Sequence, residues 1–193
     1  MIRPDKIRLL TYAAIALFAG CAASRALLDQ QGQSMIGPPG VYTLVNLHPD
    51  NQRSRLYAVN FQQPGLIPVC SQVELLELKK DLLRFRVEKT NRTYDYINHK
   101  AAAEPFEDHL RRSFGPECLA NEIEALSELD QTGISQGQAL PGMSKRGVVF
   151  ALGPPPRHTT PDLDANQWVY WIHRFNRFRI TFDPDGYVSE IQD

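Results

Sequence analysis

The chain has one cluster of residues whose types and spacing could hold a metal ion or move protons. The cluster consists of Glu104, Glu107, Asp108 and His109. Residues four apart share a helix face, so Glu104 and Asp108 would project together from a helix, with Glu107 close to them. Acidic residues are also common in a first helical turn without any ligand, because the helix dipole favours negative charge there. We therefore interpret the cluster as a solvated first turn and expect no metal ion.

Two other segments contain chemically capable residues without the neighbours that catalysis requires. Cys70 stands between Val69 and Ser71, neither of which carries the positive charge that lowers the pKa of a thiol, so we expect a structural cysteine. The segment 158–164 (HTTPDLD) combines a histidine with two aspartates, but its proline and aspartates favour a turn with Asx-type capping. The sequence also lacks the H-E-x-x-H, Walker and G-x-G-x-x-G motifs. We predict a protein without catalytic residues or a cofactor.

Composition narrows the class of protein further. The chain has 193 residues, of which 42% are hydrophobic and 22% charged, a mixture typical of globular proteins. Its 21 basic and 22 acidic residues leave no basic excess, so we expect no nucleic-acid partner. Fourteen prolines and twelve glycines predict short elements, many turns and more than one small domain.

The N-terminus has the parts of a secretory signal. The basic residues Arg3, Lys6 and Arg8 precede an apolar run over residues 9–20, and small residues follow Cys21. The run has 12 residues, whereas a helix needs roughly 20 apolar residues to cross a bilayer. We therefore predict that residues 1–20 are a cleaved signal peptide.

The end of this run, Leu17-Phe18-Ala19-Gly20-Cys21, resembles the lipobox of bacterial lipoproteins. The resemblance implies that Cys21 receives a thioether-linked diacylglycerol and becomes an acylated N-terminus that incorporates palmitate. Ala22 follows Cys21, whereas an aspartate at this position would resemble a signal for retention in the inner membrane. We therefore expect an outer-membrane lipoprotein that faces the periplasm. A plain secreted protein and a retained membrane anchor are the alternatives.

A lipidated Cys21 leaves Cys70 and Cys118 as an even pair in an oxidising compartment. We predict a disulfide between them, and two separate buried thiols are the alternative. The cysteines have no C-x-x-C spacing and no matching histidines, so we expect no zinc site.

The first part of the mature chain predicts a tether and a small β domain. Residues 21–40 are polar, aperiodic and interrupted by glycine and proline, which is typical of a flexible tether. From 41 to 99, short β-rich runs alternate with turn clusters. The predicted strands are VYTLVNL (41–47), RLYAVNF (55–61), QVELLEL (72–78), LLRFRVEK (82–89) and RTYDYIN (92–98). The stretch Gly65–Val69 and the strand after it resemble the diverging turn and second half of an SH3-like barrel.

Two helices are predicted between this domain and the C-terminal third. Phe106, Leu110 and Phe114 recur every four residues, which indicates an amphipathic helix within 100–119. A second apolar stripe predicts another helix over 119–130 and consists of Leu119, Ile123, Leu126 and Leu129. We expect these helices to bridge two domains.

The last third predicts a capped helix and three strands. Ser144 is the expected N-cap, Gly153 follows the last helical residue, and prolines 154–156 prevent continuation. Strands are predicted over 168–174, 177–183 and 187–191, and Asp185-Gly186 favours a tight turn between the last two. The chain is therefore expected to be α+β, with the order helix, helix, strand, strand, strand at its end.

These motifs together resemble the SmpA/OmlA family of small outer-membrane lipoproteins. The matching residues are Gly142, Met143, Ser144, Leu152, Gly153, Pro155, Trp168, Tyr170, Phe182, Asp183, Gly186 and Val188. The best-known members are the BamE-type accessory lipoproteins of the β-barrel assembly machinery. The resemblance covers residues 120–193 and implies a two-layer ααβββ domain with partners in envelope assembly. The chain departs from the simple type by having a further domain before this region.

Strand parity predicts a binding strip on the last sheet. One face presents Trp168, Tyr170, Phe178, Ile180 and Phe182, which we assign to the core. The opposite side presents Trp171, Arg177 and Arg179, with Arg174 nearby, and we predict that these four residues form a basic and aromatic strip that binds protein. The alternative is that the first domain packs against Trp171.

Three functions fit these observations. We expect a non-catalytic scaffold or accessory factor that holds envelope proteins near the outer membrane. The resemblance implies the β-barrel assembly machinery as a partner. The alternative is an envelope lipoprotein whose SH3-like barrel binds cell-wall peptide or glycan through an exposed aromatic groove of Tyr57, Phe61, Tyr94 and Tyr96. A secreted inhibitor of a periplasmic enzyme is a third class, for which no particular residue argues.

Overall fold

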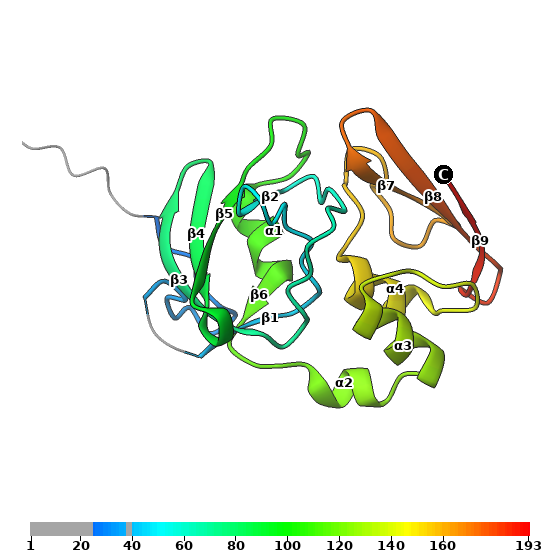
Figure 1. The fold of residues 1–193 in the computed structure, drawn as a ribbon, viewed down its shortest axis with the longest axis horizontal. Helices are drawn as coiled ribbons and strands as arrows, with labels where there is room; N and C mark the ends of the chain where they lie inside the picture. The colour runs from blue at the N-terminus through cyan, green and yellow to red at the C-terminus, as the bar shows by residue number, and fades with distance from the viewer. Residues whose placement is uncertain (1–24, 38–39) are drawn as a thin grey trace, which may run out of the picture.

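The fold is mixed α+β and is built around two separate sheets, in agreement with the predicted class. The computed structural model describes residues 25–37 and 40–193, so Cys21 and the predicted signal peptide lie outside the described residues. Figure 1 shows a first half with the larger, curled sheet and a second half with the smaller sheet, joined by the segment that contains α2. Within the described residues, no helix combines the length and the apolar character that crossing a membrane requires.

Six strands form the larger sheet in the order β2-β5-β4-β3-β1-β6. Their bounds are β1 Val41–Thr43, β2 Arg55–Tyr57, β3 Gln72–Lys79, β4 Leu82–Val87, β5 Arg92–Ile97 and β6 Phe114–Gly115. A short 3-10 helix, Glu88–Thr90, connects β4 to β5. β3, β4 and β5 form an antiparallel meander, whereas β2 pairs in parallel with β5. All five predicted strands are present, but the first two are shorter than their apolar runs.

The early end of β1 has a visible cause. The backbone N–H of Leu44 donates to Ser113 at 2.9 Å, and that of Asn46 donates to Phe150 in the second half, also at 2.9 Å. The Leu44 bond extends the register of β1 with β6 by one residue, and the chain then leaves the sheet for the second half at Asn46. Part of the predicted strand serves as a connection to the neighbouring half.

α1 (Phe106–Ser113) packs against the first sheet. Its residues Phe106 and Leu110 lie in the same buried core as Leu75 and Phe85, and Phe114 follows them as the start of β6. The apolar residues that recur every four positions therefore pack against the first sheet. α1 belongs to the first half, and the bridging role predicted for residues 100–119 falls instead to residues 116–127.

The bridging segment contains α2 (Ala120–Glu124) and leads into α3 (Glu128–Gln136). The helix predicted over 119–130 is therefore two helices. Ser127 causes the break, because its extended backbone makes it the N-cap of α3 and its Oγ accepts from the N–H of Asp130 at 3.1 Å. Leu126 packs on the second core, whereas Leu129 beyond the break is exposed.

The second half consists of α3, α4 (Lys145–Leu152) and an antiparallel sheet of β7 (Gln167–His173), β8 (Asn176–Phe182) and β9 (Val188–Gln192). Both predicted ends of α4 are confirmed. The Oγ of Ser144 accepts from the N–H of Gly147 at 3.0 Å, and Gly153 terminates the helix with a φ of 74°. The turn before β9 uses Gly186 at a φ of 86°, as its sequence predicted.

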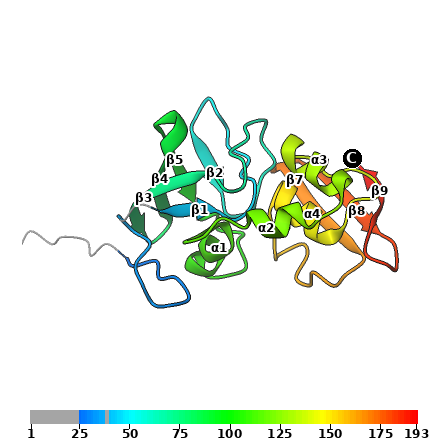
Figure 2. The ribbon, with the colours of Figure 1, turned by 90° about the horizontal axis from the view of Figure 1, so that it is seen from below.

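The second core lies between the helices and one face of the smaller sheet. Figure 2 shows α3 and α4 beside this sheet. Trp168, Tyr170, Ile180 and Phe182 are buried in it, as strand parity predicted. Phe178 is only partly buried and stacks on Tyr170 with ring centroids 5.5 Å apart.

Candidate functional site

Amide side chains of the first half cap the end of α4 in the second half. Asn46 donates from Nδ2 to the carbonyl oxygens of Ile134 at 2.7 Å and Ala151 at 3.2 Å. Asn60 donates to the carbonyl oxygen of Leu152 at 2.7 Å. The last carbonyls of a helix have no partner within it, so these bonds satisfy groups that would otherwise be buried and unpaired. Specific polar contacts therefore join the two halves.

Residues 61–63 of the first half run along the outer edge of β7. The N–H of Gln62 donates to the carbonyl oxygen of Trp171 at 2.7 Å, and Phe61 lies opposite Trp171 in a parallel bridge. Gln63 also donates from Nε2 to the carbonyl oxygen of Ile172. Trp171 is half-buried at this seam, so the first half does pack beside it.

A cavity of about 150 Å³ opens at the seam beside Trp171. Val59, Phe61, His99 and Ala101 line it from the first half, and His158, Trp171 and Arg174 line it from the second. The His158 ring stacks on Trp171 with centroids 6.2 Å apart, and the His99 ring lies 5.9 Å from that of Phe61. We call this space the seam cavity.

The polar side chains that line the seam cavity are those of His99, His158, Trp171 and Arg174. The indole Nε1 of Trp171 is buried and has no hydrogen-bond partner among the described residues. The guanidinium group of Arg174 lies over the ring of Phe175. Burial, and secondarily the neighbouring His99, lowers the pKa of His158, which favours the neutral imidazole. No acidic side chain is among the lining residues.

The predicted strip is formed in part. Trp171 pairs with Arg177 and Val169 pairs with Arg179 across β7 and β8, which puts both arginines on the Trp171 side of the sheet. The Arg177 guanidinium lies 5.7 Å from the Trp171 ring centre. Arg174 instead lies in the turn between β7 and β8 and lines the seam cavity.

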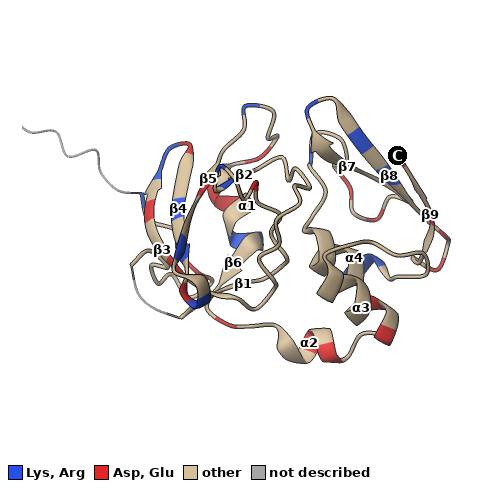
Figure 3. Cartoon of the chain, viewed as in Figure 1, with Lys and Arg blue, Asp and Glu red and all other residues tan. Residues whose placement is uncertain are grey.

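The strip carries positive charge that no described residue balances at close range. Arg174, Arg177 and Arg179 are exposed, and none of them lies within 4.0 Å of a carboxylate in the described part of the chain. Figure 3 shows basic residues, in blue, at the tip of the β7–β8 hairpin and along β8. Phe175 at the tip is 77% exposed, with the Arg174 guanidinium 4.1 Å from its ring centre. An exposed aromatic residue among unpaired arginines suits an acidic partner.

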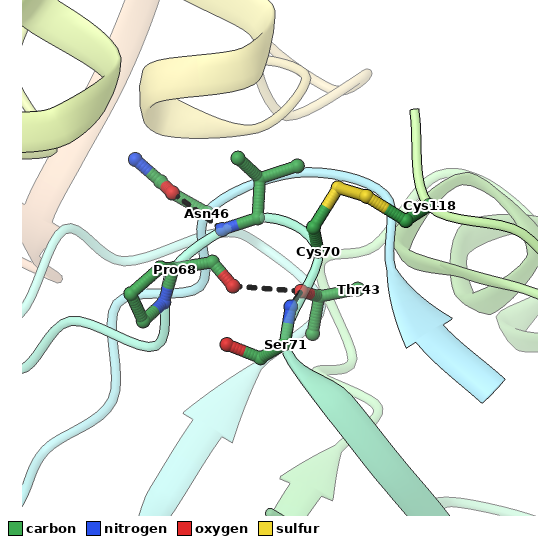
Figure 4. Close-up of a disulfide and its surroundings, with 7 residues drawn as sticks. Thr43, Asn46, Pro68, Cys70, Ser71 and Cys118 are labelled. Atoms are coloured by element: carbon green, nitrogen blue, oxygen red, sulfur yellow. Dashed lines mark hydrogen bonds between the residues drawn. A yellow bond between two sulfur atoms is a disulfide. The ribbon is translucent and has the colours of Figure 1, made fainter. Parts of the chain in front are cut away.

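The predicted disulfide between Cys70 and Cys118 is present, with a Cα–Cα distance of 4.8 Å. Figure 4 shows that it ties the turn before β3 to the bridging segment. The turn is fixed by Thr43, whose Oγ1 donates to the carbonyl oxygen of Pro68 at 2.8 Å. Cys70 is therefore a structural residue, as its neutral neighbours indicated.

The acidic cluster near α1 differs from the solvated first turn that we expected. Glu104 and His109 have side chains only 6% and 4% exposed, and His109 Nδ1 lies 3.2 Å from Glu104 Oε1. His109 Nε2 contacts the hydroxyl of Tyr96 at 2.7 Å. Burial would raise the pKa of Glu104, but hydrogen bonds from His109 and Arg112 lower it to about 2. Burial lowers the pKa of His109 and raises that of Tyr96 to about 12.

The other members of this cluster point to separate partners. Glu107 pairs with Arg25 at 2.8 Å, and Asp108 pairs with Arg111 at 2.6 Å. In the described ranges, no group of three or more histidine, cysteine or acidic residues is arranged to hold a metal ion. The short sequence spacing failed as a guide because Glu104 precedes the helix and turns inward.

The aromatic groove required by the cell-wall alternative is not formed by its four residues. Tyr94 and Tyr96 are buried in the first core. Tyr57 and Phe61 instead form a pair with ring centroids 5.5 Å apart, close to His99. The seam cavity shares only Phe61 with the predicted groove, and neither strand parity nor spacing indicated its lining from two halves.

Residues 133–137 (GISQG) have the G-x-S-x-G spacing of a nucleophile elbow. An elbow requires a sharp turn from strand to helix, whereas Ser135 lies in the last turn of α3 and its Oγ donates to the carbonyl oxygen of Thr132 at 2.8 Å. Gly137 ends the helix in the left-handed conformation. The motif is a helix C-terminus.

In the loop 158–164, Asp162 accepts from the N–H of Asp164 at 2.8 Å, which is the predicted Asx turn.

No family model matches the chain, and comparisons with the curated proteins and with the solved structures find no match either.

Proposed function

We propose that the protein is a lipoprotein, anchored to the outer membrane through Cys21, that acts as a non-catalytic scaffold or accessory factor in envelope assembly. The observation that carries the proposal is the strip of Trp171, Arg174, Arg177 and Arg179 beside the exposed Phe175. The lipobox and the SmpA/OmlA resemblance support the location. The β-barrel assembly machinery is the partner that this resemblance suggests.

The order of elements supports the finer fold within this proposal. α3, α4, β7, β8 and β9 follow one another as an ααβββ unit would, with both helices packed on one face of the sheet. The curled sheet of the first half encloses its own core, which is consistent with an SH3-like barrel. In this arrangement the helices occupy one face of the smaller sheet and leave the strip on the other.

The strip has the composition of a protein-binding surface. Tryptophan and arginine are enriched among the residues that dominate binding energy at interfaces. Arginine side chains form charge-assisted, often bidentate hydrogen bonds with carboxylates, and these three have none in the described structure. We therefore expect the partner to present aspartate or glutamate residues to β8.

Site-specific crosslinking in native membranes tests the proposal. A photoreactive residue at position 181, which shares its side of β8 with Arg177 and Arg179, should yield a defined crosslinked envelope protein. Arg177→Glu with Arg179→Glu should reduce that yield at least tenfold. Lys80→Glu with Lys89→Glu, which changes the charge equally on the first half, should leave it unchanged. Equal yields from both double variants would contradict the role of the strip.

The anchor has a separate test. Radiolabelled palmitate should enter the wild-type protein and not Cys21→Ser. Palmitate incorporation that persists in Cys21→Ser would show that Cys21 is not the lipidated residue.

A further inference from the structure

We infer that His48 makes the seam sensitive to pH, so that mild acid separates the two halves and uncovers the outer edge of β7. The inference does not depend on the proposed scaffold function, because it concerns how the two halves of the chain hold together. Separation here means a rotation of one half away from the other about the bridging segment 116–127, with both cores intact.

Many of the contacts across the seam are hydrogen bonds. Each half has a core of its own, and Val149 packs against both of them. The backbone N–H of Gln62 donates to the carbonyl oxygen of Trp171, and Asn60 donates to the carbonyl oxygen of Leu152. Water can take the place of either partner in such a bond, so the net stabilisation from each bond is small. The halves can therefore separate without unfolding either core.

His48 belongs to the first half, but its ring lies against the second. Its Nε2 lies 2.9 Å from the carbonyl oxygen of Ala151 in the last turn of α4. A carbonyl oxygen can only accept, so Nε2 carries the proton and donates. A Cβ placed at Gly137, the residue that ends α3, would lie 3.1 Å from Cε1 of His48. His48 is 7% exposed, so its imidazole is a buried group between the halves.

A second proton on the His48 ring has no compensating charge nearby. Within the described residues, no carboxylate lies within 4.0 Å of its nitrogens. Its neighbours Ala151 in α4 and Gly137 at the end of α3, and Leu66 beside them, have no titratable side chains.

Burial lowers the pKa of His48, and the bond to the carbonyl oxygen of Ala151 offsets this only in part. Separation of the halves would expose the ring to water and restore the ordinary value of about 6.5. The separated state therefore binds a proton more readily than the closed state. The closed seam keeps its full stability above about pH 6.5 and loses it as the pH falls below that value.

The other charged groups at the seam respond less to mild acid. Arg157 pairs across the seam with Glu104 at 3.4 Å, and the Glu104 pKa of about 2 keeps this pair charged. His109 contacts Glu104 within the first half. His99 and His158 line the seam cavity from opposite halves, so protons on both rings would repel each other in the same direction as the effect of His48. His158 is already exposed, which makes its contribution smaller.

Separation would free the outer edge of β7. In the closed seam, residues 61–63 cover that edge, since Gln62 donates to Trp171 and Gln63 donates to Ile172. The other edge of β7 pairs with β8. A strand edge with unpaired backbone groups can pair with a strand of another chain. His48 would therefore control access to a surface that can add a strand.

Hydrogen exchange in the full chain, with its disulfide intact, measures the separation. The probe is the backbone N–H of Gln62, and the amides of the β3–β4 and β8–β9 ladders report on the two cores. Protection is expressed relative to the unstructured chain at the same pH. Uptake of one proton predicts that the protection of Gln62 falls about tenfold to thirtyfold from about pH 7.5 to about pH 5, with a much smaller change in the ladders. Unchanged protection at Gln62, or an equal fall in the ladders, would overturn the inference.

Histidine variants and one titration assign the effect. His48→Gln keeps a side-chain donor for Ala151 but does not titrate, so the protection of Gln62 should become nearly independent of pH. His173→Gln, the matched control at an exposed position, should keep the wild-type profile. In the unsubstituted protein, the His48 ring should titrate below the ordinary pKa of about 6.5 when followed by NMR. A wild-type profile in His48→Gln, or a His48 ring that titrates at or above about 6.5, would overturn the inference.

Discussion

The carboxylate of Asp130 joins the starts of α3 and α4, and we predict that Asp130→Ala lowers the free energy of unfolding by about 3 to 5 kcal/mol. The residue is 2% exposed. Its Oδ1 accepts from the N–H of Ser144 at 2.8 Å. Its Oδ2 accepts from the hydroxyls of Ser144 at 3.1 Å and Ser127 at 2.9 Å. Three bonds are lost: the charge-assisted bond from the backbone N–H of Ser144 accounts for about 1.5 to 3 kcal/mol, and the two hydroxyl bonds, from the partly buried Ser144 and the exposed Ser127, account for the rest.

Gly147 makes this prediction testable by a double-mutant cycle. A Cβ at position 147 would lie 2.0 Å from Asp130 Oδ1 and 2.6 Å from its Cγ, so Gly147→Ala must displace the carboxylate. We expect a loss of about 2 to 4 kcal/mol, although alanine in a helix interior is otherwise better than glycine by roughly 0.5 to 1 kcal/mol. After Asp130→Ala both of these atoms are gone and only the Cβ of residue 130, at 2.9 Å, remains close, so the second substitution should cost much less. The coupling energy should therefore be at least about 2 kcal/mol.

Urea unfolding followed by tryptophan fluorescence measures all four corners of this cycle, because Trp168 is buried in the same half. Glu128→Ala is the matched control, since it removes an exposed acidic residue from the first turn of α3 and should change stability by no more than about 0.5 kcal/mol. A loss below about 1 kcal/mol for Asp130→Ala, or additive effects of the two substitutions, would refute the reasoning.

Three further predictions concern other parts of the molecule. Replacing both Cys70 and Cys118 by serine opens a link over a sequence separation of 48 residues and should lower the free energy of unfolding by about 4 kcal/mol in the chain-entropy treatment; an unchanged urea midpoint would contradict this. Glu104 has a folded-state pKa of about 2, despite burial that acts in the opposite direction, so its stabilisation should be present above the unfolded-state pKa of about 4.3 and be lost as pH falls toward 2. Glu104→Gln should flatten that part of the pH profile, and parallel profiles for the two proteins would exclude this cause. Trp171→Ala should lower the free energy of unfolding by about 2 kcal/mol, roughly half the loss for a fully buried aromatic side chain, while Phe175→Ala should have almost no effect; equal losses would show that the seam does not bury Trp171.

Local signals in the sequence predicted most of the elements. These elements depend on residues that are adjacent in the chain. They are the strand runs of 72–78, 82–89 and 92–98, the caps of α4 and the Asp-Gly turn before β9. Errors arose where partners distant in sequence decided the outcome. The apolar stripe at 106–114 predicted a helix but could not indicate which sheet that helix would pack against. The apolar stripe at 119–129 predicted one continuous helix, although Ser127 carried the signal for a second N-cap.

The candidate site was predictable only for the part on one hairpin. Strand parity placed Trp171 and Arg177 on the same side of the smaller sheet, because the pairing partner lies within a few residues. Strand parity carries no information on which residues of the other half pack against the same strand. The seam cavity takes His99 from after β5 and His158 from the loop before β7, and no sequence pattern relates these positions. The burial of Glu104 was missed for the same reason, since Arg157 of the second half lies 3.4 Å from it.

Asn46 connects the disulfide turn to the seam. Its Oδ1 accepts from the N–H of Val69 at 2.7 Å, immediately before Cys70 (Figure 4), while its Nδ2 donates to the carbonyl oxygen of Ile134 in α3. Asn46 is buried, so moving either partner would leave a polar group unpaired at a cost of about 1 to 3 kcal/mol. The disulfide ties the same turn to the bridging segment, so the covalent and hydrogen-bonded links between the halves meet at one turn. The seam cavity is lined from both halves, and these contacts outside it fix one half against the other.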